Sequence, residues 1–408
     1  MSNPELTLSI WQRPVFRTYM GSTGFSGMAL AMQQLLLSWV LVGIMERPAD
    51  EVGLIQAVIG VPSLFLMLVG GARSDSQDPR RLLLLVYVIA PIFPLFMWLV
   101  EGALGLAIWS VMVWGMGVSI VQALSMPAQQ AILNEISGKS VQQGVTVATA
   151  IGMVVQVVGL ILAGQMERIG VGTVLLVQAV SFACAAIAIR RLPSLPVAST
   201  SSNESAWQQI TDGLRATMQD RVIKSVLGIN FLSSIFNAGS MMTVFPFIVK
   251  RVYEGDAFML SLLMALFFGL AAISNTILLR FMPLARPGRL YLLFQLSRVV
   301  VLSLLYIKGD WWLLTLAVML WGLNMGMTSN LARTIVQESA QPEFRGRILS
   351  VFTVTMMGSA PIGALVLGFI IEIFGTLNAL LPAIFLSLVL AIYGSLRTPV
   401  WAYRSPQA

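Results

Sequence analysis

The chain has 408 residues, of which 57% are hydrophobic and only 11% are Asp, Glu, Lys or Arg. A soluble protein carries roughly 25% charged residues, so this composition excludes water as the main solvent and indicates a membrane protein. The sequence has no His and a single Cys, Cys184. This excludes His-ligated metals and haems, four-cysteine zinc sites and disulfides within the chain. We therefore expect no metal site, no cofactor and no enzymatic activity.

Apolar runs follow one another along the chain, separated by short polar clusters. None alternates with period 2 as a membrane barrel would, so we expect an all-α membrane protein. The first run is about 30 residues long and has no small-residue cleavage pattern, so it is predicted to be a helix and not a signal peptide. Twelve transmembrane helices are predicted, at 16–45, 52–72, 82–100, 104–133, 144–166, 171–190, 222–249, 257–281, 290–307, 311–337, 348–374 and 376–396.

The basic residues gather on one side of these predicted helices. With a cytoplasmic N-terminus, 19 of the 25 Lys and Arg residues fall in inner segments and five in outer loops, whereas the acidic residues divide equally. This follows the positive-inside rule and predicts a multi-pass protein of a bacterial-type inner membrane, with both termini cytoplasmic. Topology and anionic lipid account for basic pairs such as Arg190-Arg191, so we expect no nucleic-acid partner.

The second half of the chain repeats the glycine spacing of the first. Three glycines recur about 204 residues later: Gly159, Gly164 and Gly170 answer to Gly363, Gly368 and Gly375. Between the halves, 191–221 is rich in Pro, Ser and Thr and then shows apolar residues at helical spacing, which predicts a cytoplasmic linker with an amphipathic helix on the inner leaflet. We predict two pseudo-symmetric six-helix halves, 1–190 and 222–408, an architecture that suits alternating access.

A loop motif gives the first resemblance to a known family. Gly71 and Asp75, followed by the basic pair Arg80 and Arg81, resemble the loop motif of the major facilitator superfamily. Four further segments, Phe16-Arg17, Pro127 to Asn134, Asp212-Gly213-Leu214-Arg215 and Arg345-Gly346-Arg347, resemble the subgroup that contains the enterobactin exporter and drug efflux proteins. The resemblance implies the major facilitator fold and a secondary transporter, an exporter, with helices one, four, seven and ten lining the cavity. It also implies that Asp75 contacts the start of helix eleven.

Uncharged polar side chains form stripes on the four helices that would line the cavity. The candidate substrate-binding residues among them are Gln33, Gln122, Asn230, Asn237 and Asn324. Such stripes can equally hold helices together. With few charges and many Met and aromatic residues, the expected substrate is a neutral or weakly ionised amphiphile.

Arg298 is the only charge deep within a predicted helix, about 12 Å from its start at 1.5 Å per residue. Tyr291 and Gln295 share its face. Arg298 either anchors an anionic substrate or has a structural role, satisfied by backbone carbonyls or a partner helix. Proton-driven carriers commonly keep a titrating group in the membrane, and the nearest candidates are Glu101 and Glu135, which can also be hydrated helix ends. Val111 stands where proton-coupled members of the family often have Arg.

The sequence thus predicts an exporter of a small amphiphilic molecule, such as a drug or siderophore, whose partners are this substrate and the lipid bilayer. We expect a monomer. An importer or a lysolipid flippase remains the alternative. The sequence has no Gly-x-x-x-x-Gly-Lys-Ser/Thr motif, which disfavours ATP-driven pumping. A membrane-embedded enzyme is disfavoured by the missing His, and a channel by the lack of a charged ring or filter-like loop.

Overall fold

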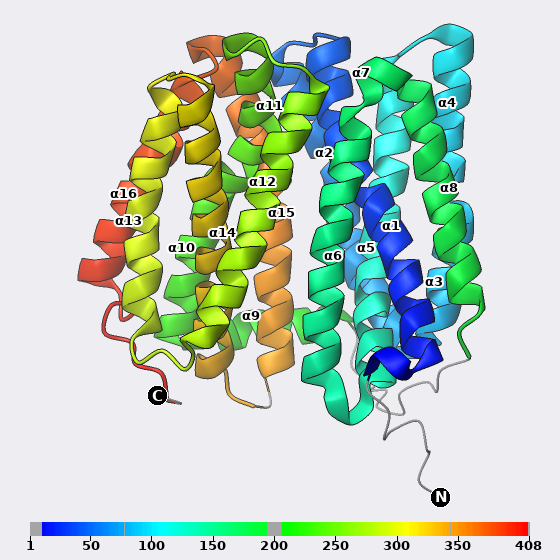
Figure 1. Ribbon diagram of the computed structural model, residues 1–408. Coiled ribbons are helices and arrows are strands. Elements are labelled where there is room, and N and C mark those ends of the chain that lie inside the picture. The colour runs from blue at the N-terminus through cyan, green and yellow to red at the C-terminus, as the bar shows by residue number, and fades with distance from the viewer. Residues whose placement is uncertain (1–9, 77, 194–205, 343, 407–408) are drawn as a thin grey trace, which may run out of the picture. The chain divides into compact units, whose positions relative to one another are not determined.

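The computed structural model describes residues 10–76, 78–193, 206–342 and 344–406 (Figure 1). All regular elements in these ranges are helices, and eleven of them are long and apolar enough to cross a membrane. A further helix, α2 (Ala49–Ser76), has 28 residues, although nothing is described of its side chains at 65 and 67–76. The prediction of an all-α membrane protein is confirmed.

The chain folds as two compact units. Unit 1 comprises Met1–Val40 and Val58–Asn203. Within it, α1 packs against both α6 and α8. The span that begins with α3 is broken at Ala90 and Pro91, because Pro94 supplies no N–H to the carbonyl of Ala90. Besides part of α2, its helices are α1 (Pro14–Trp39), α3 (Pro79–Ile89), α4 (Ile92–Leu104), α5 (Ile108–Ser137), α6 (Val141–Gly164), α7 (Met166–Ile169) and α8 (Val171–Arg190).

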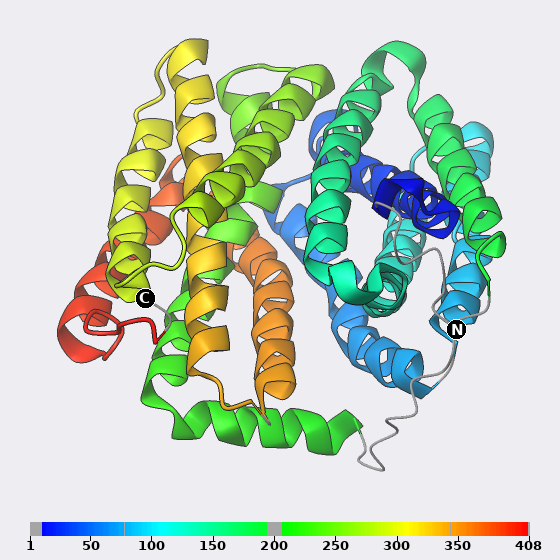
Figure 2. The same cartoon turned by 60° about the horizontal axis from the view of Figure 1, so that its bottom comes forward.

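Unit 2 comprises Leu41–Ala57 and Glu204–Ala408. Its helices are the start of α2, α9 (Ala206–Gln219), α10 (Arg221–Gly239), α11 (Phe245–Phe247), α12 (Ala257–Arg280), α13 (Pro287–Tyr306), α14 (Trp311–Ser339), α15 (Arg345–Phe374) and α16 (Leu381–Arg397). The π-helical segments Ser240–Val244 and Ile248–Val252 flank α11. Figure 2 shows α9 crossing the unit beside the start of α15, with which it packs.

Carboxylates begin several of these helices. Asp220 Oδ1 accepts hydrogen bonds from the first N–H groups of α10 at 2.8 Å, and Asp256 and Asp310 cap α12 and α14 in the same way. Asp78 caps α3. A carboxylate satisfies free N–H groups and the partial positive charge at a helix N-terminus. The caps explain why so many acidic residues lie at helix ends.

The glycine repeat has the same structural role in both units. In unit 1, Gly159 lies against the carbonyl of Met28, so α6 can approach α1 closely; in unit 2, Gly363 lies against the carbonyl of Ile235, so α15 can approach α10. Gly170 and Gly375 both have a positive φ, 86° and 92°, just before α8 and just after α15. Only glycine adopts such a backbone conformation without strain.

The predicted linker contains the helix α9, while its residues 194–205 lie outside the described part of the chain. Gly213 of α9 packs on the backbone of Arg347, at the start of α15, and Asp212 pairs with Arg347 at 3.4 Å. Leu214 and Met218 are exposed. The side chains of the predicted apolar residues 207 and 210 are outside the described residues.

Candidate functional site

A buried arginine joins three helices of unit 2. Arg298 of α13 is only 3% exposed. Its Nε donates to Asn324 Oδ1 and its Nη2 to Thr328 Oγ1, both at 3.1 Å and both on α14. Its Nη1 donates to Gln295 Oε1 at 3.0 Å and to Ser233 Oγ of α10. We call these five residues the arginine cluster.

All four partners of the guanidinium are neutral. No ion pair within 4.0 Å involves Arg298 in the part of the chain that the structure describes. Removing a charge from water is costly, and hydrogen bonds to neutral oxygens offset only part of that cost. The arrangement therefore can hold α10, α13 and α14 together, and its unneutralised charge attracts an anionic or acceptor group that reaches it.

Helical spacing explains how the cluster forms. Gln295 and Arg298 are three residues apart on α13, and Asn324 and Thr328 are four apart on α14, so each pair lies on one face of its helix. Asn324 is held further by its Nδ2, which donates to the carbonyl of Phe294 at 2.7 Å. Arg298, Gln295 and Asn324 were all identified from the sequence. Backbone carbonyls were one predicted partner of Arg298, but its partners in the structure are side chains.

The other two predicted cavity residues of unit 2 lie on α10. Asn237 is half-buried, and its Oδ1 accepts from Trp321 Nε1 at 2.6 Å. Asn230 lies one turn before Ser233 and is 6% exposed, and its Nδ2 has no hydrogen-bond partner among the described residues. Because buried polar groups are normally paired, this donor is unusual, and substrate binding by Asn230 and Asn237 stays a prediction.

In unit 1 the predicted residue Gln33 belongs to a buried amide network. Gln178 of α8 donates from its Nε2 to Gln33 Oε1 at 2.9 Å and to the carbonyl of Ala29 at 3.0 Å. Trp114 of α5 donates to Gln178 Oε1 at 3.2 Å. The network ties α1 to α5 and α8. Sequence reasoning missed Gln178, although a lone amide in an otherwise apolar run was a usable signal.

A second network in unit 1 uses residues of the predicted stripes on α1 and α5. Gln129 donates to Tyr87 Oη at 2.5 Å, Tyr87 donates to Ser26 Oγ at 3.1 Å, and Tyr19 donates to the carbonyl of Gln129 at 2.7 Å. Gln122 of the same stripe is exposed. These hydrogen bonds show that part of the polar stripes holds helices together, and substrate binding by Gln33 and Gln122 stays a prediction.

The loop motif lies partly within a helix. We predicted that the second helix ends near residue 72, but α2 continues to Ser76, so Gly71 and Asp75 are in its last turns. Their side chains, and with them the expected contact of Asp75 with the start of helix eleven, lie outside the described residues. Arg80 donates from its Nη2 to the carbonyl of Arg190, at the end of α8, at 2.7 Å, whereas Arg81 is exposed.

The two candidate coupling residues lie at helix ends. Glu101 is in the last turn of α4, half-buried beside Gly172 near the start of α8. Glu135 is exposed in the last turn of α5. Nothing in these positions distinguishes a proton carrier from a hydrated helix end, so their role in coupling stays a prediction.

Two compact units of membrane-length helices with matching glycine contacts agree with carriers of the major facilitator type, which are built from two repeated halves. Residues 6–406 match the family described as transmembrane secretion effector (MFS_3), and the chain belongs to this family. The protein is therefore a major facilitator transporter, and the predicted fold of twelve helices in two halves is confirmed.

Solved structures of transporters share this fold. A mutant of the nucleoside transporter NupG matches with a TM-score of 0.76 and 14% identity, over 93% of this chain and 98% of that chain. A bacterial homolog of the human lysosomal transporter Spinster, in an inward-facing and unoccupied conformation, matches with a TM-score of 0.76 and 12% identity, over 96% and 98%. The human organic anion transporter TETRAN gives 0.69 and 14%, over 94% and 100%. No curated protein matches the sequence.

Proposed function

We propose that this protein is a secondary active transporter that exports a small amphiphilic molecule across the inner membrane by alternating access. The observation that carries the proposal is the match of nearly the whole chain to a family described by secretion. The resemblance to the enterobactin exporter and drug efflux subgroup points in the same direction. Apart from Arg298, the side chains of the arginine cluster and of the two networks in unit 1 are uncharged, which favours a substrate with little charge.

The proposed substrate-contacting residues are Gln33, Gln122, Asn230, Asn237, Asn324 and Arg298. The argument is strongest for Asn230 and Gln33, because the buried Nδ2 of Asn230 and the buried Nε2 of Gln33 have no partner in the described chain. It is weakest for Asn324, whose amide nitrogen and oxygen are both hydrogen-bonded within the bundle. We further propose a monomer with both termini in the cytoplasm and with functional halves 1–190 and 222–408. The motif of Gly71, Asp75, Arg80 and Arg81 would control the exchange between conformations.

We propose that Glu101 or Glu135 couples transport to protons, and two variants test this. Glu101→Gln and Glu135→Gln each remove one titrating group with little change in shape. If one of these residues couples transport to protons, its variant loses pH-gradient-driven flux in proteoliposomes. Undiminished flux in both variants would reject the assignment and point to another gradient.

A susceptibility screen tests the export function. Cells that lack or overproduce the protein are compared over antibiotics, dyes, siderophores and lysolipids, and each compound found is followed as flux in vesicles of known orientation. We expect overproduction to lower susceptibility and the flux to be saturable and outward. Inward flux would make the protein an importer, and transfer of a lysolipid between leaflets would make it a flippase.

A further inference from the structure

A tryptophan motif recurs in the two halves of the chain. The residues Val-Met-Val-Trp-Gly at 111–115 of α5 have a counterpart, Val-Met-Leu-Trp-Gly, at 318–322 of α14. The two tryptophans, Trp114 and Trp321, are 0% and 1% exposed. An indole N–H can donate a hydrogen bond but cannot accept one. A buried indole therefore fixes which end of an amide faces it.

In unit 2, Trp321 fixes the amide of Asn237. The ring of Trp321 packs edge to face against Phe245 and Phe267, with ring centroids 6.0 and 5.2 Å apart, so packing determines its orientation. Its Nε1 donates to Asn237 Oδ1 at 2.6 Å. Because the oxygen of the amide faces the indole, the nitrogen faces away from it. The half-buried Asn237 therefore presents N–H donors on its free side.

In unit 1, Trp114 fixes the amide of Gln33 through Gln178. Trp114 Nε1 donates to Gln178 Oε1 at 3.2 Å, which leaves Gln178 Nε2 to donate to Gln33 Oε1 at 2.9 Å. The amide nitrogen of Gln33 is then left over, and this buried Nε2 has no hydrogen-bond partner among the described residues. The indole at one end of the network thus produces a free donor at the other end.

Gln33 and Asn237 occupy corresponding positions in the two halves. They lie on α1 and α10, and Asn237 follows Gln33 by 204 residues, which is the spacing of the glycine repeat. In both units the oxygen of the amide is engaged toward the indole and the nitrogen is left free. Asn230 Nδ2, also on α10, is a further buried donor without a partner in the described chain. An unpaired buried donor is costly, so these groups favour a ligand that supplies acceptors.

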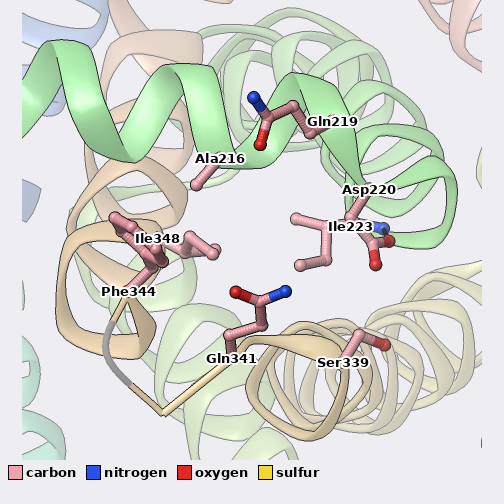
Figure 3. A pocket seen from close by; sticks show the side chains of 8 residues that line it. All are labelled: Ala216, Gln219, Asp220, Ile223, Ser339, Gln341, Phe344 and Ile348. Carbon is pink, nitrogen blue, oxygen red and sulfur yellow. Dashed lines mark hydrogen bonds between the residues drawn. The ribbon is translucent and has the colours of Figure 1, made fainter.

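This bias toward donors is absent from another polar site of unit 2. A cavity between α9, α10 and the facing ends of α14 and α15 is lined by the carboxylate of Asp220 and the amides of Gln219 and Gln341 (Figure 3). Such a lining supplies acceptors as well as donors. The bias therefore belongs to the amides that the two indoles fix.

We propose that the substrate is an amphiphile whose polar groups are hydrogen-bond acceptors, such as carbonyl, ester or ether oxygens. Trp114 and Trp321 are positioning residues, because they turn the amides so that donors face the substrate. This inference rests on the proposed function, in which Gln33 and Asn237 contact the substrate. Arg298 fits the same preference, since a guanidinium only donates. A site built to hydrogen-bond one kind of group rejects a ligand that lacks it, because the polar groups of the site are then left unpaired.

The indole N–H resonances test the two pairings without any substrate. Trp114→Phe and Trp321→Phe identify the two signals in the spectrum of isotope-labelled protein in detergent. We expect Asn237→Leu to shift the Trp321 signal and Gln178→Leu to shift the Trp114 signal. Gln341→Leu, in the cavity of Figure 3, is the control and is expected to leave both signals in place. A Trp321 signal unmoved by Asn237→Leu, or a Trp114 signal unmoved by Gln178→Leu, would overturn the role of that indole.

Paired compounds test the substrate class in the unaltered protein. Each compound of the susceptibility screen that the protein moves is compared with two analogues. In one analogue a carbonyl is replaced by a methylene, and in the other an N–H or O–H donor is methylated. We expect each lost carbonyl to weaken competition for flux about tenfold, and methylation to leave competition nearly unchanged. Equal competition by the carbonyl compounds and their methylene analogues would refute the acceptor preference.

Trp321→Phe tests the positioning role, because it frees the amide of Asn237 while keeping an aromatic ring. The preference for a carbonyl compound over its methylene analogue is expected to fall about tenfold. Trp312→Phe is the control, since Trp312 is 82% exposed, and it is expected to leave the preference unchanged. An unchanged preference in Trp321→Phe would refute the positioning role alone. A parent protein that moves no compound of the screen would refute the proposed function and, with it, the substrate class.

Discussion

Arg298 carries a positive charge into the interior of unit 2, and its contacts in the described chain are all with neutral oxygens. Three helices are therefore joined through one side chain, and Asn324 Oδ1 has Arg298 as its donor, whereas Ser233 also donates to Gln295 Oε1. Asn324 Oδ1, Gln295 Oε1, Thr328 Oγ1 and Ser233 Oγ all accept from it. Loss of a buried partner costs about 1–3 kcal/mol for each group left unsatisfied.

Arg298→Gln is accordingly expected to destabilise the protein by at least about 2 kcal/mol, because a shorter amide cannot reach α10 and α14 together. Arg333→Gln is the control, since Arg333 is exposed on α14. The thermal unfolding midpoint in detergent is the measurement. Equal midpoints for Arg298→Gln and Arg333→Gln would show that the cluster does not stabilise the bundle. Lost substrate binding by Arg298→Gln at unchanged folded yield would instead favour the anchor role.

The sequence identifies unusual residues better than their partners. Arg298 is conspicuous as a lone charge in an apolar run, and Gln295 follows from helical spacing. Ser233 was missed, and the sequence has serine at both 233 and 234. A one-residue difference turns a side chain by about 100° around a helix, and only the position of the adjacent helix decides which serine is used.

Glycines at helix–helix contacts allow particular pairs of helices to pack closely. Gly363 of α15 meets the carbonyl of Ile235 and the Cα of Gly239, whereas Gly228 of α10 has no atom within 4 Å of an added Cβ. Gly363→Ala is expected to lower the free energy of unfolding by about 1–3 kcal/mol through overpacking. Gly228→Ala is expected to be neutral or stabilising, since alanine favours helix. Thermal unfolding of the two variants checks the pair, and equal effects would contradict the close approach of α10 and α15.

The C-terminal tail after α16 gives a pH-dependent prediction. Tyr403 donates to Glu338 Oε2 at 3.2 Å, and Ser405 donates to Glu338 Oε1 at 3.0 Å. Burial, and to a smaller degree the nearby Glu338, raises the pKa of Tyr403. The folded protein therefore binds the phenol proton of Tyr403 more tightly than the unfolded chain does. The resulting stabilisation is complete below about pH 10 and is lost as the pH rises through the pKa of Tyr403 in the folded state.

Tyr403→Phe removes this titrating group while keeping the ring. We expect the stability of the variant not to fall at alkaline pH as that of the wild type does. At neutral pH the variant is expected to be less stable by under about 1 kcal/mol, because the site is partly exposed. Thermal unfolding at a series of pH values measures both. An alkaline decline that persists unchanged in Tyr403→Phe would assign it to other groups.

Element positions and the glycine repeat could be predicted from the sequence, because apolar length and glycine spacing follow directly from the membrane and from close packing. Gly159 and Gly363 indeed pack their helices in the same way. The extension of α2 to Ser76 was not foreseen, since the polar residues of the motif read as a loop. The hydrogen bond that Glu372 Oε2 of α15 accepts from the backbone N–H of Ala49 at 3.2 Å was also missed, because the two residues are more than 300 positions apart in the sequence.

For the whole molecule, the distribution of basic residues predicts that both termini face the cytoplasm. In a Cys184→Ala background, single cysteines replace the exposed residues Trp11 and Arg404, and a third replaces Lys308 in a predicted outer loop. An impermeant maleimide applied to intact spheroplasts is expected to label only the cysteine at position 308. Labelling at position 11 or 404 would reverse or break the predicted topology.

We propose above that the protein is a carrier that moves a small amphiphile outward. Flux of a compound from the susceptibility screen, measured in inside-out vesicles, tests it most directly. We predict saturable accumulation in these vesicles, driven by an ion gradient. Non-saturable ohmic current, or saturable transport only in right-side-out vesicles, would contradict it.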